Sequence, residues 1–490
     1  MNKFRFRACT MLLAGVVLLM TSGAASAQEY RTEHDLLGEK QIPANAYYGV
    51  QTARAIDNFQ ISGTPLYRYP ELVNALAVVK LAAARANHRA GALEKDVLDG
   101  IEAACAAIIA GEYHDQFLVD LYQGGAGTST NMAANEIIAN VALEKMGYEK
   151  GRYDIVEPHD DLNMSQSTND FYPTALKVAM LRYNEPLLAE LEALAAAFEA
   201  KGEEFSEYLK MGRTELQDAV PMTLGQEFHA FGTTLRSQIA TIRTLEKELY
   251  GVNMGGTAIG TRLNAAEGFP KYCAEDLAEL TGKPMYSVDD LIAATSDLHG
   301  FVMYSSALRG LATRLNKTAN DLILLSSGPR TGFYEFNLPA VQPGSSIMPG
   351  KVNPVMPELV NCVAMQVIGN DLTVSYAQSF GQLQLNAYEP VVAAAILESQ
   401  ELLINTLRTF REKCVEGITA NAAHTQEQVE RSIGIVTALN PVLGYETATE
   451  IAAEALKTGK GVLEIVRERQ LLSEEELQKI LDPKTMTGQK

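Results

Sequence analysis

The residues whose types best suit catalysis lie together in the loop Gln342–Pro354, which reads Q-P-G-S-S-I-M-P-G-K-V-N-P. Its three prolines and two glycines exclude a helix. The loop also carries two adjacent hydroxyls, Ser345 and Ser346, one cation, Lys351, and one amide, Asn353. A candidate base, hydrogen-bond donors and an anion-binding group therefore lie close together, although a polar connecting loop would have the same composition.

Three more polar segments interrupt the helical pattern of the chain. Two of them, G-G-A-G-T-S-T-N-M at 124–132 and N-M-S-Q-S-T-N-D at 163–170, come directly before helical patterns. Free backbone N–H groups at the start of a helix bind anions, although helix capping alone would also explain both segments. The third, G-R-T-E-L-Q-D-A-V-P at 212–221, has Thr214 and Glu215 in a non-helical turn, and surface charge is its simplest interpretation.

The other reactive side chains do not form a recognisable site. None of the seven histidines lies in the four segments or has metal-ligand spacing, and no G-x-S-x-G elbow is present. The cysteines beyond Cys9 lack C-x-x-C spacing, so we expect buried thiols at Cys105, Cys273, Cys362 and Cys414. The four segments therefore suit a small dicarboxylate held by hydroxyls and amides, with no metal and with an acid or base that need not be histidine.

Long helices are needed to position these segments, and helical periodicity dominates the chain. The strongest pattern runs from Leu291 to Leu325, where Phe301, Leu308, Leu315 and Leu322 repeat every seven residues. Further helices are predicted over 131–146, 173–200, 357–380 and 393–414. Sustained seven-residue spacing is typical of helices that bury part of their apolar face against other chains. We therefore expect a mainly α protein with a long central helical bundle that is completed by oligomerisation.

The first 27 residues are expected to be a secretory signal peptide outside the folded protein. Lys3, Arg5 and Arg7 precede an apolar run from Met11 to Met20, and a stretch of small residues ends at Ala27. The apolar run is shorter than the roughly 20 residues that a membrane-spanning helix needs. We therefore expect cleavage after Ala27 and a periplasmic or secreted protein; an uncleaved anchor is the alternative.

The charge and the length of the remaining chain limit its possible partners and its number of domains. Loss of the signal removes three cations and no anions, so the formal net charge goes from −19 to −22. Such an acidic surface argues against nucleic acid or an anionic membrane as a partner. The expected organisation is an N-terminal domain at 28–166, a central helical-bundle domain at 167–417 and a small C-terminal helical domain at 418–490.

Taken together, the four segments resemble the motifs of the fumarase/aspartase superfamily. The matched regions are G-S-S-I-M-P-G-K-V-N-P, G-A-G-T-S-T-N-M, S-Q-S-T-N-D and G-R-T-x-L-Q-D-A-V-P, and the resemblance runs in order from about residue 31 to about residue 485. Details at 128–130, 167–170, 325–330 and 381–386 are more similar to aspartate ammonia-lyases than to fumarases. The resemblance implies a three-domain fold in a homotetramer, with a bundle from all four chains, active sites shared by three subunits and no cofactor.

The same resemblance implies roles for the matched residues. Ser345 would be the general base that takes a proton from C3 of L-aspartate, on a loop that closes over the substrate. Elimination of ammonia through an enediolate-like intermediate would then give fumarate. The residues implied to hold the β-carboxylate are Thr128, Ser167, Thr168 and Ser346; those for the α-carboxylate are Thr214, Lys351 and Asn353; those facing the amino group are Asn169 and Glu215.

Some positions depart from the family pattern, and two other functions stay open. Glu215 stands where histidine or glutamine is usual, and a carboxylate there favours an amine substrate over malate. Arg262 stands where glycine is usual. The segment E-P-H-D-D at 157–161 replaces the H-P-N of a second anion site, so no such site is expected. The alternatives are a fumarate hydratase and a non-catalytic periplasmic protein that binds dicarboxylates.

Overall fold

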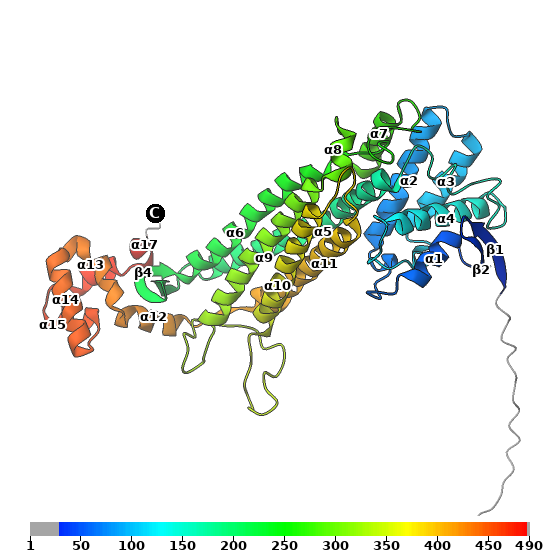
Figure 1. The fold of residues 1–490 in the computed structure, drawn as a ribbon. Helices are drawn as coiled ribbons and strands as arrows, with labels where there is room; N and C mark the ends of the chain where they lie inside the picture. Colours follow the sequence, from blue (N-terminus) through cyan, green and yellow to red (C-terminus); the bar gives the residue numbers. More distant parts are fainter. Residues whose placement is uncertain (1–28, 488–490) are drawn as a thin grey trace, which may run out of the picture.

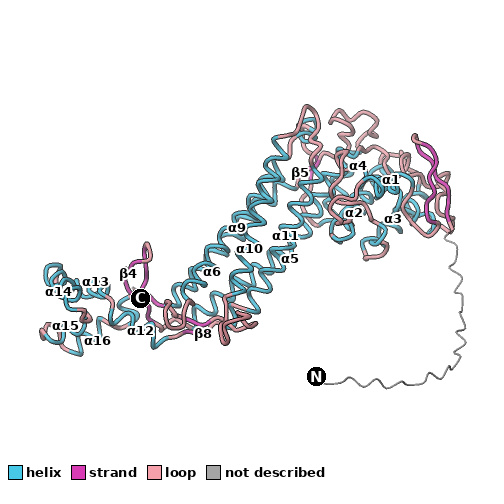
Figure 2. The backbone as a smooth tube through the Cα atoms, turned by 60° about the horizontal axis from the view of Figure 1, so that its bottom comes forward, coloured by secondary structure: helices cyan, strands magenta, loops and turns pink. Residues whose placement is uncertain are grey.

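The computed structural model describes residues 29–487, and most of them are in α-helices (Figures 1 and 2). The expected signal peptide, residues 1–27, lies outside this range. Between residues 29 and 487, strands occur only as four two-stranded sheets, and no helix is long and apolar enough to cross a bilayer. The mainly α fold class predicted from the sequence is therefore confirmed.

The N-terminal region combines a β-hairpin with four helices at one end of the molecule (Figure 1, blue to cyan). The hairpin pairs β1 (Tyr30–Asp35) with β2 (Gly38–Pro43). The helices are α1 (Val50–Asn58), α2 (Pro70–Arg89), α3 (Lys95–Ile109) and α4 (Thr128–Lys145). α2 begins with a proline, which is suited to the first helical turn because no N–H partner is needed there, and most of its length is buried.

Five long helices form the central bundle, which runs diagonally across Figure 1. They are α5 (Thr168–Glu204), α6 (Leu224–Leu245), α9 (His299–Leu325), α10 (Val355–Ser379) and α11 (Glu389–Lys413). α5 and α6 begin with capping boxes, formed by Ser167 with Asp170 and by Thr223 with Gln226. The first of these boxes fixes the start of α5 inside the polar segment 163–170.

The four residues of the seven-residue pattern lie in α9 and are at most 2% exposed in the single chain, so they pack in its own core and not against another chain as the spacing predicted. The predicted helix 291–325 is wrong at one point, because α8 (Leu291–Ser296) ends before α9 begins. At the break, the Asp297 carboxylate accepts the His299 N–H (3.0 Å), and Gln378 of α10 accepts the Leu298 N–H (2.6 Å). Side chains thus satisfy backbone groups that a continuous helix would have paired.

Short elements complete the chain at the far end of the bundle and between the helices. The hairpin of β3 (Leu209–Thr214) and β4 (Gln217–Thr223) joins α5 to α6. A second core forms around Leu209, Met211 and the C-terminal helices. These helices are α12 (Ala422–Arg431), α13 (Val436–Leu443), α14 (Tyr445–Thr458), α15 (Val462–Glu468), α16 (Glu474–Ile480) and α17 (Pro483–Met486). The remaining elements are α7 (Phe269–Thr281), β5 (Gly251–Val252) paired with β6 (Tyr286–Ser287), and β7 (Phe336–Asn337) paired with β8 (Thr419–Ala420).

One of the four cysteines differs from its expected environment. Cys105, Cys273 and Cys414 are buried, whereas Cys362 is exposed. Cys362 lies on the side of α10 that faces away from the rest of its own chain, while Val360 and Val363 of the same helix are buried. The expectation of a buried thiol at Cys362 is therefore wrong for the single chain.

Candidate active site

A polar cleft of about 680 Å³ lies where α4 and α5 begin. Its wall includes Thr128, Ser167 and Thr168, three of the residues expected to bind substrate. None of the residues that line it, all in the described part of the chain, is lysine or arginine. A carboxylate in this cleft would therefore be met by the N-termini of two helices and by side-chain hydroxyls and amides, although His159 and Asp160 also line the wall.

The hydroxyls of the cleft wall differ in how the protein holds them. Ser167 Oγ accepts the N–H of the residue two positions later (3.3 Å), and Thr168 Oγ1 accepts the side-chain amide of Asn131 (3.1 Å). Because a hydroxyl has one proton to donate, both groups keep that proton for another partner. Thr128 instead donates to the Gly125 carbonyl (2.8 Å), so it must rotate to donate to a ligand.

Asp170 ties the two walls of the cleft together. Its carboxylate accepts the backbone N–H groups of Ser167 (2.9 Å), Gly255 (3.0 Å) and Thr257 (2.8 Å). Burial raises the pKa of Asp170 to about 7, because the cost of desolvating the charge outweighs these hydrogen bonds. The start of α5 and the loop that faces it are thus joined by a carboxyl group whose pKa folding raises from its usual acidic range to about 7.

We expect Asp170→Asn to flatten the pH dependence of stability. Between about pH 4 and 7 the unfolded chain is ionised at Asp170, whose ordinary pKa is 3.8, while the folded protein keeps the proton. This group should therefore lower the parent's free energy of unfolding by about 1.4 kcal/mol for each pH unit gained in that range. Urea unfolding of both proteins at pH 5 and pH 7 measures the effect. A stability difference between them that stays constant with pH would contradict the prediction.

The connection between β7 and α10 is folded on itself around Ser345. Ser345 Oγ accepts the backbone N–H groups of the residues two and three positions later (3.2 and 2.9 Å), and the Asn353 amide donates to the Gly344 carbonyl (2.7 Å). Two N–H donors aimed at one oxygen favour its anionic form, which a serine base requires. The Lys351 side chain is exposed. The Lys351 cation and the second N–H of the Asn353 amide therefore remain available to bind a ligand.

Thr214 and Glu215 lie at the tip of the β3–β4 hairpin. Glu215 and Leu216 form its two-residue turn with φ angles of 53° and 62°. Residues other than glycine rarely adopt a positive φ. Two such residues in succession store backbone strain of the kind found in binding segments. Arg262, where the family pattern has glycine, also has a positive φ of 63°. The left-handed conformation explains why glycine is usual at that position.

A buried carboxylate joins the hairpin to the chain directly before β7, which leads into the Ser345 loop. Glu335, fully buried directly before β7, pairs with Lys210 (2.6 Å between Oε2 and Nζ) and with Arg213, and both cations belong to β3. The Arg213 guanidinium also lies 4.5 Å from the ring centroid of Phe333. The hairpin and the strand that leads into the Ser345 loop therefore form one connected unit.

Within one chain, this unit and the cleft lie at opposite ends of the bundle. α4 and the start of α5 lie with the N-terminal region, whereas the β3–β4 hairpin and the connection from α9 to α10 lie at the other end (Figures 1 and 2). α5, which separates them, has 37 residues, or a length of about 55 Å. A single chain therefore does not bring Ser345, Ser346, Lys351 or Asn353 to Thr128, Ser167 and Thr168.

The cleft wall also contains residues that were not expected from the sequence, among them Gln51, Asn131 and His159. The Nε2 atoms of Gln51 and His159 are 3.0 Å apart, and a hydrogen bond with Glu157 raises the pKa of His159. Asn131 belongs to the segment 124–132, so its amide was the signal that could have identified it. Gln51 lies 108 residues from His159 and in no motif, so only the fold reveals it.

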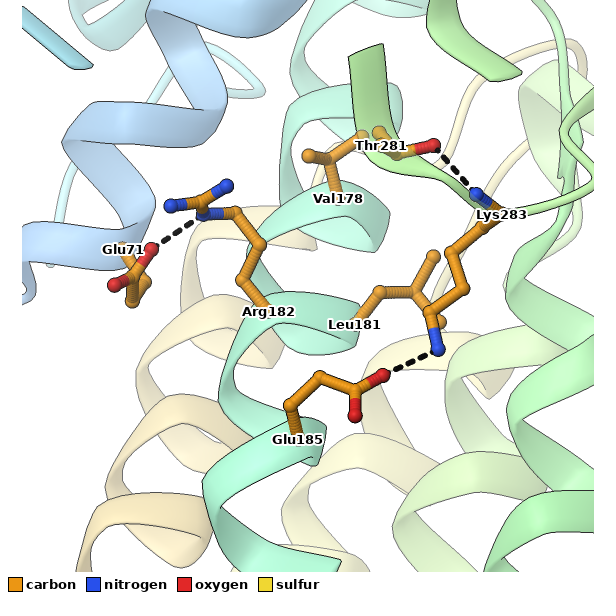
Figure 3. A pocket seen from close by; sticks show the side chains of 7 residues that line it. All are labelled: Glu71, Val178, Leu181, Arg182, Glu185, Thr281 and Lys283. Atoms are coloured by element: carbon orange, nitrogen blue, oxygen red, sulfur yellow. Dashed lines mark hydrogen bonds and ion pairs between the residues drawn. The ribbon is translucent and has the colours of Figure 1, made fainter. Parts of the chain in front are cut away.

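A second cavity, of about 260 Å³, lies between α2, α5 and the segment that leads to β6 (Figure 3). Arg182 donates to Glu71 there, and Lys283 donates to Glu185. Each of these cations already faces a carboxylate, so the cavity offers little net attraction to a dianion. The cleft at α4 and α5 is the better candidate for the site of dicarboxylate chemistry.

Known proteins share this fold over nearly the whole chain. A solved structure of "fumarate lyase:delta crystallin" from Brucella melitensis, bound to cobalt, has a TM-score of 0.90 and 51% identity, and the match covers 93% of this chain and 99% of that one. A class II fumarase from Schistosoma mansoni has a TM-score of 0.88 and 34% identity over 94% of this chain and 100% of that one. Solved structures of a fumarate lyase and a fumarase therefore have the same helical-bundle fold as this chain.

Sequence comparison agrees. The profile of the family described as "Lyase" matches residues 38–369, and that described as "Fumarase C C-terminus" matches residues 435–488. An aspartate ammonia-lyase from Pseudomonas canavaninivorans is 57% identical over 463 residues, which cover 94% of this chain and 98% of the relative. The chain belongs to the fumarase/aspartase superfamily of lyases.

Proposed function

We propose that this protein catalyses the reversible deamination of L-aspartate to fumarate and ammonia. The observation that carries the proposal is the cleft, where two helices begin and where the hydroxyls of Ser167 and Thr168 each accept a hydrogen bond and so keep a proton for a carboxylate. The similarity to aspartate ammonia-lyases over nearly the whole chain supports the choice of amine substrate.

The chemistry follows from where charge develops. Ser345, as general base, takes a proton from C3, and the electron pair left behind spreads into the β-carboxylate as an enediolate. Donors in the cleft bind this dianionic group more strongly than the ground-state carboxylate, so they stabilise the transition state. The pair then forms the C2=C3 bond while the C2–N bond breaks, and nitrogen leaves with the electrons of that bond as ammonia.

The other matched residues fit the α-carboxylate and the ammonium. Thr214, Lys351 and Asn353 supply a hydroxyl, a cation and an amide for the α-carboxylate. The Asn169 amide nitrogen donates to the Ala258 carbonyl (2.7 Å), which leaves its oxygen to accept a proton of the substrate ammonium. The Glu215 carboxylate attracts that ammonium and has no comparable attraction for the hydroxyl of malate.

We further propose a homotetramer whose active sites each combine residues of three subunits. The separation of Ser345 from the cleft within one chain requires another copy to supply it. α10 also presents an apolar stripe to the outside, with Met365 69%, Leu372 58% and Tyr376 58% exposed. This stripe continues into an apolar groove of about 340 Å³ between α10 and the start of α11. So large an exposed apolar surface on a bundle helix fits contact with a second copy.

Leu372→Glu should break this assembly and abolish activity, because a charge would have to be buried between helices. Size-exclusion chromatography with light scattering should show dimers or monomers in place of the tetramer. The rate of fumarate formation from L-aspartate should fall by at least about tenfold. Leu456→Glu is the matched control, since Leu456 is 72% exposed on α14 of the C-terminal region. A Leu372→Glu protein that stays tetrameric and active would refute the role of the stripe.

The reaction itself is tested by following fumarate absorbance with L-aspartate or L-malate as substrate. We expect turnover of L-aspartate and release of equimolar ammonia. Turnover of malate alone would instead identify a fumarate hydratase. Thermal stabilisation by fumarate without turnover of either compound would identify a binding protein.

We also propose that the protein is exported and that its signal peptide is cleaved after Ala27. The support is the sequence pattern of charged, apolar and small residues described above. Mass spectrometry of the protein from a periplasmic fraction should give a chain that starts at Gln28. Recovery of the uncleaved chain from the cytoplasm would refute the proposal.

A further inference from the structure

A chain of buried hydrogen bonds leads from the protein core to the Thr168 hydroxyl. It begins at Lys80 of α2, whose side chain is only 1% exposed. Lys80 Nζ donates to Gln166 Oε1 (2.9 Å) and to Asn163 Oδ1 (3.2 Å). An amine surrounded by oxygens acts as a donor, so the amide oxygen of Asn163 must face it.

A second contact fixes the same orientation. The amide nitrogen of Asn163 donates to the backbone carbonyl of Gln166 (3.2 Å), and a carbonyl can only accept. Asn131 must then turn its nitrogen toward Asn163 Oδ1 (3.0 Å), and the same nitrogen donates to Thr168 Oγ1 (3.1 Å). The Asn131 oxygen is buried without a hydrogen bond to any described residue, so the nitrogen alone sets the direction of this amide.

We propose that Asn131 is a positioning residue that acts through Thr168. By donating to Thr168 Oγ1, it leaves the Thr168 proton free to point into the cleft, where it donates to a carboxylate of the ligand. A turned Asn131 amide would offer its oxygen instead, and the Thr168 proton would then bond to Asn131 rather than to the ligand. The inference rests on the proposed function, because it assigns the cleft to a substrate carboxylate.

A double-mutant cycle tests this proposal with Asn131→Leu, Thr168→Val and the double variant, each as the full chain in its native assembly. The probe is succinate, a dicarboxylate that cannot eliminate ammonia, and its dissociation constant is measured by calorimetry. We expect Thr168→Val to weaken binding about 10- to 100-fold and Asn131→Leu about fivefold. The double variant should bind within about twofold of Thr168→Val, because Asn131 then has no hydroxyl to orient.

Effects that multiply in the double variant, or an Asn131→Leu protein that binds succinate like the parent, would overturn the proposal. A merely structural role of Asn131 would lower the melting temperature and leave the two effects independent. If Asn131→Leu does not fold, Asn131→Ser is used, whose side chain is too short to reach Thr168, with the same expected cycle. The parent's ammonia release is assayed on the same preparations. Its absence would refute the proposed function, whereas release together with independent effects would refute only the role of Asn131.

Discussion

Replacing Ser345 by alanine should lower kcat for aspartate deamination by about 10²- to 10⁴-fold, the range that a general base contributes. KM should change little, because Ser345 is assigned to proton removal and not to binding. The two backbone N–H groups that point at Ser345 Oγ are the structural reason to expect that the serine can reach its deprotonated form. Steady-state measurement of fumarate formation gives both constants.

The matched control for this variant is Ser326→Ala. Ser326 starts the same connection from α9 to α10, and among residues 29–487 its hydroxyl donates a hydrogen bond only to the Ile323 carbonyl of its own helix (3.4 Å). It should keep the parent's kcat and melting temperature. A Ser345→Ala protein that retains more than about a tenth of the parent's kcat would show that another group removes the proton.

Replacing Glu335 by glutamine should destabilise the protein by about 3–5 kcal/mol, the cost of breaking a buried ion pair. Glutamine has nearly the same shape, but it removes the carboxylate that pairs with Arg213 in a buried setting, while Lys210 keeps its second partner, Glu227. Activity should also fall, because Glu335 holds the Thr214 hairpin to the chain that leads into the Ser345 loop. Urea unfolding and the fumarate assay measure the two effects.

Glu416→Gln provides the comparison for Glu335→Gln. Glu416 pairs with Arg411 at 2.8 Å, but its side chain is 50% exposed. Solvent screens such a pair, so the loss of stability should be below about 1 kcal/mol. Equal losses in the two variants would mean that the buried pair does not anchor the hairpin.

The long helices could be predicted because their apolar spacing is a local property of the sequence. The break between α8 and α9 could not, because Gln378, distant in sequence, supplies part of the bonding at Leu298. The strands β5, β6, β7 and β8 were also missed, since they have two residues each and no alternating pattern to detect. Cys362 was misplaced because its burial depends on the face of α10, which spacing alone did not resolve.

The candidate site was predicted in part. Motif spacing identified the hydroxyls of the cleft and the loop that carries Ser345, because each motif is contiguous in sequence. It did not indicate the buried contacts that orient them, such as Asn131 on Thr168 or Glu335 on β3, since those partners come together only through folding. The direction of a hydrogen bond, which decides whether a hydroxyl can donate to a ligand, has no sequence signal at all.

The central claim, that Ser345 of one subunit serves the cleft of another, is tested most directly by mixing two inactive proteins. One carries Ser345→Ala and the other carries Ser167→Ala with Thr168→Val, and they are co-expressed so that their subunits assemble at random. If the two halves of a site come from different chains, about a quarter of the sites regain both, and about a quarter of the parent's kcat should return. Activity no higher than the sum of the two separate variants would contradict the account.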